Sequence, residues 1–398
     1  MKYIVMLCDG MAGYPLESLG NKTTMMKAYK PNMDRMAKTS TMGLVKTVPD
    51  SLSPGSDVAN LAAMGFDATE CYTGRSPLEA ISIGIDMAKT DIAFRCNLVT
   101  LSDDEKYAEK TMKDYSSQEI TTAEAAELIA AVNDAFKTDE IEFFAGISYR
   151  HCMIWHNGPC GLGLTPPHDI SDRKITDYVP KNGRLFELMS KSYDILKDHP
   201  INKSRSSRGL NPANSIWLWG EGTKPEIPNF KEIRGLNGSV ISAVDLIKGI
   251  GISTGFNVVE VEGATGNINT SFENKCLAAL NELKNGADYV YIHVEAPDEC
   301  GHRGEIENKI KSIEYIDGQI IGPLTKQLEN MGEEYTILIM PDHPTPIATK
   351  THARDAVPFM IYRSGAPVNG RDKFDEEEAK LTNIYFKNGL ELYKEFLK

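Results

Sequence analysis

The sequence predicts an α/β fold, with an open and mostly parallel β-sheet flanked by helices and a smaller α+β unit inserted into it. Short apolar runs rich in β-branched residues occur at residues 2–8, 289–294 and 335–340, and helical patterns lie between such runs. Acidic or imidazole side chains follow each of the three runs. Because parallel strands end together at one edge of a sheet, where open sheets bind ligands, we expect a polar site there.

The first part of the chain alternates strand and helix. Residues 2–8 have the short, apolar pattern of a buried strand. Residues 24–38 have an amphipathic helical pattern, and residues 43–48 form a second candidate strand. A Gly-, Ser- and Pro-rich loop then enters a helix of small residues, with Ser56 at its N-cap or in its first turn.

The pattern changes at Tyr72, where β-rich segments with one clear helix begin. We expect a loop and short helix at 74–80, strands at 91–101, 140–144 and 147–155, an Ala-rich helix at 121–136, and a loop at 157–182. This pattern indicates a separate α+β unit over residues 70–182, inserted into an α/β core of residues 1–69 and 183–398.

The α/β alternation returns after residue 183. In chain order we expect a helix at 185–196, a polar loop at 199–213, a strand at 215–219, a helix at 239–247, a strand at 258–261, a helix at 272–283, a strand at 289–294, a long helix at 305–330, a strand at 335–340 and a C-terminal helix at 382–396. Neither the glycine spacing of a dinucleotide-binding fold nor a P-loop occurs.

Composition limits the classes of function. A chain of 398 residues is too long for one compact core, so two domains are expected. The net charge of −13 argues against nucleic acid or an anionic membrane as partner, but it leaves room for a small anionic substrate. Seven scattered cysteines without a C-x-x-C motif are typical of a reducing cytoplasm. We expect no signal peptide and no membrane span.

Five potential ligands lie near strand ends in the last third of the chain. Asp298 and His302 are four residues apart, Asp342 and His343 are adjacent after a strand, and His352 precedes a short apolar strand. A single Asp-His pair is commonly a turn with a surface imidazole. Three clusters at one sheet edge favour a divalent metal site, and mixed Asp and His ligands suit zinc or manganese better than calcium.

Two residues of the first part could join this site. Asp9-Gly10 is by default a turn, but it also places a carboxylate at the same sheet edge. Ser56 could simply cap its helix. Alternatively it is a nucleophile, because a helix N-terminus stabilises a phosphoryl group and a nearby metal lowers the pKa of a hydroxyl.

The expected inserted unit contains several arginines and histidines, each more typical alone of an exposed surface than of a ligand contact. Arg150 stands on an apolar strand and His168 in a Pro-Pro-His-Asp loop. Arginine is the usual partner of carboxylates and phosphates, since its guanidinium binds them with two hydrogen bonds. We take Arg75, Arg150 and Arg173 as candidate substrate-binding residues.

Taken in order, these motifs resemble the metal and nucleophile set of the alkaline phosphatase superfamily. Over nearly its whole length the chain is similar to cofactor-independent phosphoglycerate mutases of the archaeal type. Bacterial relatives of that group include proteins proposed to be homoserine kinases. The motifs that carry the resemblance are Asp9-Gly10, Ser56, Gly74-Arg-Ser-Pro-Leu-Glu79, Leu236–Gly255, Asp298 with His302, Asp342-His343 and His352.

The resemblance implies two divalent ions, with manganese or magnesium usual and zinc possible. One ion would be held by Asp298, His302 and His352, and the other by Asp9, Asp342, His343 and the Ser56 oxygen. Ser56 would accept the phosphoryl group from 2- or 3-phosphoglycerate and return it to the other hydroxyl. The inserted unit would be a cap that excludes water, with His168 as a proton shuttle.

The leading interpretation is therefore a phosphoglycerate mutase acting through a phosphoserine. A homoserine kinase on the same scaffold is the main alternative, because the glycerate-binding residues of better-known mutases do not align cleanly with this chain. A metal-dependent phosphohydrolase, in which water attacks phospho-Ser56, is a third interpretation. A binding module without activity is a fourth. Oligomeric state stays open at this stage.

Overall fold

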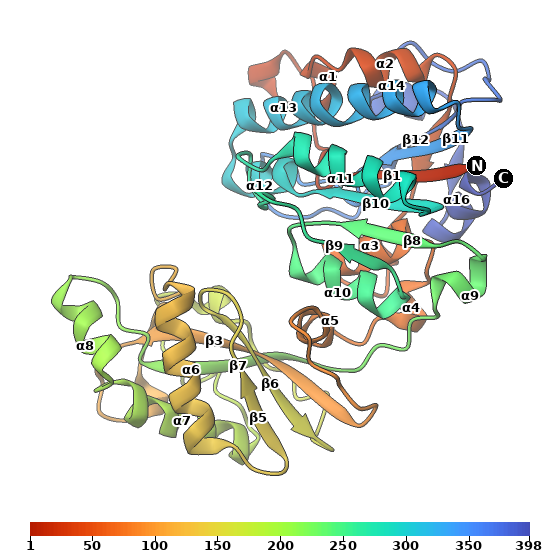
Figure 1. Ribbon diagram of the computed structural model, residues 1–398. Helices are drawn as coiled ribbons and strands as arrows, with labels where there is room; N and C mark the ends of the chain where they lie inside the picture. The colour runs from red at the N-terminus through yellow and green to blue at the C-terminus, as the bar shows by residue number, and fades with distance from the viewer. The chain divides into compact units, whose positions relative to one another are not determined.

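The structure is a computed structural model that describes residues 1–398, and it divides into two compact units (Figure 1). The larger unit comprises Met1–Tyr72 and Glu226–Lys398, and the inserted unit comprises Thr73–Pro225. The boundary expected near residue 183 is corrected to residue 225. The reason is that β7 (Ser215–Thr223) pairs with a strand of the inserted unit, and α7 (Gly183–Leu196) packs on β7.

An eight-stranded sheet forms the centre of the larger unit, in the order β13-β2-β12-β11-β1-β10-β8-β9. Only β12 runs antiparallel to its neighbours, so the expectation of a mostly parallel sheet is confirmed. The strands are β1 (Lys2–Cys8), β2 (Thr41–Val45), β8 (Gly238–Ile241), β9 (Asn257–Val259), β10 (Tyr289–Val294), β11 (Tyr335–Met340), β12 (Val357–Arg363) and β13 (Tyr385–Phe386).

Helices cover both faces of this sheet (Figure 1). One face carries α1 (Thr24–Lys27), α2 (Pro31–Ala37), α11 (Phe272–Lys284), and α13 (Ile306–Tyr315) continued by a π-helical segment (Ile316–Ile321) and α14 (Gly322–Met331). The other face carries α3 (Ser56–Ala63), α10 (Asp245–Thr254) and α16 (Gly389–Phe396). The shorter helices are α4 (Ala68–Cys71), α9 (Phe230–Arg234), α12 (Ala296–Arg303) and α15 (Glu376–Lys380).

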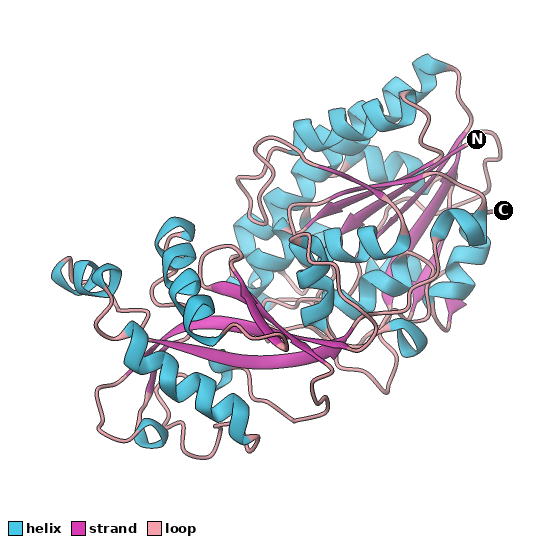
Figure 2. Cartoon of the chain, turned by 60° about the horizontal axis from the view of Figure 1, so that its bottom comes forward, coloured by secondary structure: helices cyan, strands magenta, loops and turns pink.

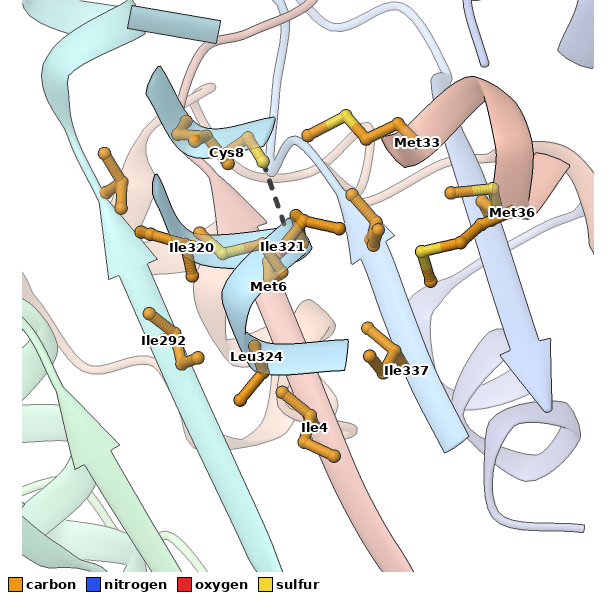
Figure 3. Packing of buried hydrophobic residues seen from close by; sticks show 14 of the residues in the cluster. Ile4, Met6, Cys8, Met33, Met36, Ile292, Ile320, Ile321, Leu324 and Ile337 are labelled. Carbon is orange, nitrogen blue, oxygen red and sulfur yellow. Dashed lines mark hydrogen bonds between the residues drawn. The ribbon is translucent and has the colours of Figure 1, made fainter. Parts of the chain in front are cut away.

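The main core lies between the central strands and the α11–α14 face. Ile4, Met6 and Cys8 alternate along β1 toward this face and meet Ile292 of β10 and Ile337 of β11 (Figure 3). From the helices, Met33, Met36, Ile320, Ile321 and Leu324 complete the cluster. Since alternate residues of a strand face opposite sides, the odd-numbered residues of β1 and β10 face α3 and α10.

The inserted unit is an antiparallel sheet with helices, as expected for an α+β unit (Figure 2). Its strands follow the order β4-β3-β6-β5, and β7 pairs with β3. The remaining elements are α5 (Arg75–Ser82), β3 (Asp91–Leu101), β4 (Met112–Asp114), α6 (Thr122–Phe136), β5 (Ile141–Phe144), β6 (Arg150–His156) and α8 (Pro200–Ser207).

Four local predictions were wrong or incomplete. The expected helix at 24–38 is broken before Pro31, since proline cannot continue a helix from the preceding turn. The expected loop at 199–213 contains α8, which polar contacts of Asn202 and Arg205 hold in place. Residues 239–241 are a strand, because β8 pairs with β10. The C-terminal helix begins only at Gly389.

Two expectations from composition can be compared with the structure. All seven cysteines are free thiols, and only Cys160 is exposed. No helix is both long and apolar enough to cross a membrane.

We predict that Ile292→Ala destabilises the protein by about 2–5 kcal/mol, because it leaves a cavity between the sheet and α11. The measurement is the free energy of unfolding in urea. Leu277→Ala, on the exposed side of α11, is the control and should change this free energy by no more than about 0.5 kcal/mol. Equal effects of the two substitutions would contradict the packing described here.

Candidate functional site

Strand register brings the first acidic residue to the C-terminal ones. In the parallel pairs, Leu7 of β1 lies beside His293 of β10 and Met340 of β11. Asp9 and Asp342 each follow two residues later, so they meet just beyond the strand ends. The Gly10 N–H donates to Asp342 Oδ1 at 3.1 Å, and Asp9 Oδ1 lies 3.7 Å from His343 Nε2.

The helix after β10 supplies the second cluster. Asp298 and His302 lie one turn apart on α12, and His302 Nε2 is 3.2 Å from Asp298 Oδ2. The loop before β12 brings His352, whose Nε2 lies 2.9 Å from His302 Nε2 and 3.5 Å from Asp298 Oδ1. Asp298, His302 and His352, which were predicted as ligands, therefore lie close together.

Ser56 is the first residue of α3 and lies against the same cluster. Its Oγ is 3.1 Å from His343 Nε2, and the helix has no side-chain cap hydrogen bond. Ser56 is thus not the capping residue that its sequence position would suggest. Its hydroxyl is directed toward the imidazole and the carboxylates at the end of the sheet.

The arrangement suits divalent cations. Donor atoms of Asp9, Asp342 and His343 lie within 4.8 Å of one another, and so do those of Asp298, His343 and His352. Asp9 Oδ1 is buried and has no hydrogen-bond partner, which is costly unless a cation binds it.

The imidazole rings of His302 and His343 are oriented so that they could bind a cation. The His302 Nδ1–H donates to the Lys350 carbonyl at 2.9 Å, since a carbonyl can only accept. The Thr345 hydroxyl donates to Asp298 and so accepts from the Nδ1–H of His343, at 3.2 Å. Both rings therefore direct Nε2 toward the cluster, the atom through which each would bind a metal once it has lost its proton, and their other nitrogens are anchored as in protein metal sites.

The electrostatics of the site are dominated by buried carboxylates. Burial and the neighbouring Asp342 and Asp298 raise the pKa of the Asp9 carboxyl well above 3.8. Burial alone would also raise the pKa of Asp298, but hydrogen bonds with His302 and His352 bring it well below 3.8. The cluster therefore holds excess negative charge that a cation would balance.

Four further side chains support the site and were not predicted. Asn60 donates to Asp342 Oδ2 at 2.9 Å, and its own carbonyl accepts from the Tyr291 hydroxyl at 2.7 Å. His293 Nε2 lies 2.8 Å from Asp9 Oδ2. Thr345 connects Asp298 to His343. The only signal in the sequence was the position of Asn60, one helical turn after Ser56.

The fourth, Lys309 of α13, joins the two loops that carry the site. Its buried Nζ donates to the carbonyls of Gly10, at 2.7 Å, and Thr345, at 2.6 Å. Burial lowers the pKa of Lys309 to about 8, although Asp298, Glu376 and Asp9 act in the opposite direction. Gly10 itself has φ +61°, and a Cβ there would lie 2.5 Å from Asp298 Oδ1, so the turn requires glycine.

The inserted unit has its own cluster of charged and aromatic side chains. Glu79 binds Arg75 at 2.8 Å and Arg95 at 3.0 Å, and the Arg95 guanidinium stacks 4.4 Å from the Trp219 ring centre. The His168 ring packs on Trp219 with ring centres 5.4 Å apart. Burial lowers the pKa of His168, so it is neutral near pH 7.

Only part of the predicted substrate-binding set lies in this cluster. Burial alone would raise the pKa of Glu79, but the positive charges of Arg95, Arg75 and Arg150 together lower it. Arg150 therefore interacts electrostatically with the same carboxylate as Arg75 and Arg95. Arg173 instead donates to the Tyr178 hydroxyl at 3.4 Å, and no hydrogen bond or ion pair joins it to the cluster. The centre of the cluster is formed by Arg95 and Glu79, which were not among the predicted substrate-binding residues.

We predict that Lys309→Met weakens Mn²⁺ binding about tenfold or more, because it frees the loops that carry Asp9 and His343. Stability should fall on the order of 1–3 kcal/mol, since buried carbonyls lose their donor. Calorimetric titration and urea unfolding measure the two effects. Lys311→Met, exposed on the same helix, should leave both unchanged, and wild-type Mn²⁺ affinity in Lys309→Met would contradict this role.

The site also predicts a pH dependence of the ion-free protein. The hydrogen bond with Asp298 raises the pKa of His302 to about 9, above the ordinary 6.5. This contribution to stability is complete below pH 6.5 and is lost as pH rises through 9. Urea unfolding in a chelator at pH 6, 7.5 and 9 measures it. His302→Gln should remove this part of the decline, and an unchanged pH dependence in that variant would refute the assignment.

Comparison with known proteins gives a consistent result. The family model of 2,3-bisphosphoglycerate-independent phosphoglycerate mutase matches residues 37–202. A Geobacter sulfurreducens protein named as a probable member is 48% identical over 100% of both chains. A Methanosarcina mazei protein with the mutase name is 48% identical over 96% of this chain and 95% of its own.

Solved structures show the same fold. A Pyrococcus horikoshii protein superposes with a TM-score of 0.83 at 28% identity, covering 100% of this chain and 96% of its own. The cofactor-independent phosphoglycerate mutase of Thermoplasma acidophilum gives a TM-score of 0.66 at 22% identity, covering 100% and 99%. With full-length relatives at nearly half identity, the chain belongs to the 2,3-bisphosphoglycerate-independent phosphoglycerate mutase family.

Proposed function

We propose that this protein interconverts 2-phosphoglycerate and 3-phosphoglycerate through a phosphorylated Ser56. The observation that carries the proposal is the position of the Ser56 hydroxyl, 3.1 Å from His343 within a cluster of buried carboxylates and imidazoles. The mutase name of full-length relatives supports the reaction. Seven unpaired cysteines are consistent with a cytoplasmic enzyme.

Two divalent ions, Mn²⁺ or Mg²⁺ with Zn²⁺ as an alternative, would complete the site. We assign Asp298, His302 and His352 to one ion, and Asp9, Asp342, His343 and Ser56 to the other. When bound, such ions lower the pKa of a serine hydroxyl and balance the charge of a transferring phosphoryl group. The Nε2 atoms directed toward the cluster and the unpartnered Asp9 Oδ1 support this assignment.

The chain's own residues then account for the transfer. The Ser56 oxygen attacks phosphorus, the P–O bond to the glycerate breaks, and the released glycerate hydroxyl takes up the proton that Ser56 gives up. The glycerate reorients, and its other hydroxyl attacks phospho-Ser56 to regenerate the serine. Ser56 begins α3, so free N–H groups and the helix dipole favour the phosphoryl group there.

The inserted unit would hold the glycerate and keep water from phospho-Ser56. Arg75, Arg95 and Arg150 suit the carboxylate of the glycerate, because guanidinium groups bind carboxylates with two hydrogen bonds. A neutral His168 beside them could pass a proton between the glycerate hydroxyls. Arg173 has the weakest support, since it contacts Tyr178 instead.

The two alternative functions, homoserine kinase and phosphohydrolase, require different reactants. A homoserine kinase would need a nucleotide as phosphoryl donor, and the relatives described above carry the mutase name. A phosphohydrolase would let water attack phospho-Ser56 and release phosphate. Neither alternative has a structural feature that favours it over the mutase.

We predict that Ser56→Ala lowers the conversion of 3- to 2-phosphoglycerate at least about a thousandfold, because it removes the nucleophile. An enolase-coupled assay with Mn²⁺ measures the rate, and mass spectrometry of acid-quenched enzyme should find phosphate on Ser56 only in the wild type. Ser51→Ala, exposed in the same loop, is the matched control and should keep wild-type activity.

Substantial mutase activity in Ser56→Ala would refute the covalent route. No mutase activity in the metal-loaded wild type would refute the proposed reaction. In that case, ATP consumption dependent on L-homoserine would identify the kinase, and rapid phosphate release from an aryl phosphate would identify the hydrolase.

A further inference from the structure

His293 is an ionisable side chain in the interior of the larger unit. It lies on β10, next to Leu7 of β1, and its side chain is 0% exposed. Its Nε2 is 2.8 Å from Asp9 Oδ2, and its Nδ1 is 3.1 Å from Ser242 Oγ at the end of β8. The reaction scheme above gives His293 no task, although it contacts one of the proposed ligands.

The hydrogen bonds that link Asp9, His293 and Ser242 have a defined direction once Asp9 is ionised. A carboxylate can only accept, so the imidazole donates its Nε2–H to Asp9 Oδ2. A neutral imidazole then has a bare Nδ1, which accepts from the Ser242 hydroxyl. The Ser242 oxygen is positioned in turn by the Val244 N–H, which donates to it at 3.0 Å.

The two oxygens of Asp9 are therefore unequal. Oδ2 is occupied by His293, whereas Oδ1 is buried without a partner and faces His343 Nε2 at 3.7 Å. His293 lies on β10, and Ser242 and Asp9 directly follow β8 and β1, which are its neighbours in the sheet, so the geometry is built on rigid elements. The backbone of His293 is also held, because buried Lys275 donates to its carbonyl at 3.0 Å.

We infer that His293 is a positioning residue, which with Ser242 holds Asp9 so that a single oxygen, Oδ1, is offered to a divalent cation. Without the donor, Oδ2 would be a buried carboxylate oxygen lacking a partner, and Asp9 could rotate away from the ion or bind it with both oxygens. Outer hydrogen-bond partners of metal ligands contribute about 10–100-fold in metal affinity.

This inference rests on the ion site of the proposed function but not on the mutase reaction, so ion binding is the readout. Chelator-treated full-length protein is titrated with Mn²⁺ in a calorimeter, without substrate. His293→Leu removes the donor at similar volume. His293→Gln restores an N–H near the position of Nε2. Ser242→Ala removes the partner of Nδ1.

Ser239→Ala is the matched control. Ser239 is buried on the same strand, β8, but its hydroxyl donates to Glu282 at 2.6 Å and has no path to Asp9. Thermal unfolding of each ion-free variant by circular dichroism accompanies the titrations. If His293→Leu does not fold, His293→Gln and Ser242→Ala still test the inference.

We expect two Mn²⁺ ions in the wild type and a 10–100-fold weaker Kd for only one of them in His293→Leu. His293→Gln should recover most of the affinity, Ser242→Ala should weaken the same ion by a smaller factor, and Ser239→Ala should match the wild type. Wild-type affinities in both His293→Leu and Ser242→Ala would overturn the inference while leaving the proposed function intact. Equal weakening of both ions in His293→Leu and His293→Gln would also overturn it, and a wild type without Mn²⁺ binding would overturn both proposals.

Discussion

The structure depends on keeping three carboxylates, those of Asp9, Asp298 and Asp342, close together and out of water. Like charges in a buried site repel one another, and each pays a desolvation cost. The surrounding residues reduce this cost through backbone N–H groups, imidazoles and a buried lysine, yet Asp9 Oδ1 still has no partner. A fold that maintains such a cluster is organised to bind cations, and the proposed chemistry follows from their presence beside Ser56.

The polar clusters of the two units have opposite charge. The larger unit gathers carboxylates at the end of its parallel sheet, whereas the inserted unit gathers Arg75, Arg95 and Arg150 around the single carboxylate of Glu79. A phosphoglycerate has two anionic ends, a phosphoryl group and a carboxylate. A cation at the carboxylate cluster and the guanidinium groups of the inserted unit each suit an anionic group, so an acidic chain can act on an anionic substrate.

Sequence reasoning was most successful where the spacing of residues is itself geometric. Asp298 and His302 share a helix face, and Asp342-His343 follows a recognisable strand, so their convergence was predictable. Lys309 was missed because its partners are brought near only by the packing of α13, and Asn60 had no signal beyond its place one turn after Ser56. His293 was missed because its role depends on strand order and register. The same limit explains why β8 was taken for helix, and why the inserted unit was ended before β7. In α8, buried polar contacts replace the apolar periodicity on which helix prediction depends.

The central claim is that residues far apart in sequence hold two cations beside one serine hydroxyl. Anomalous X-ray diffraction from crystals grown with Mn²⁺ tests this most directly, because it locates the ions independently of the protein coordinates. We expect two strong peaks, one bounded by Asp298, His302 and His352 and the other by Asp9, Asp342, His343 and the Ser56 oxygen. Ions bound elsewhere, or Ser56 lying beyond about 3 Å from any ion, outside inner-sphere bonding distance, would contradict it.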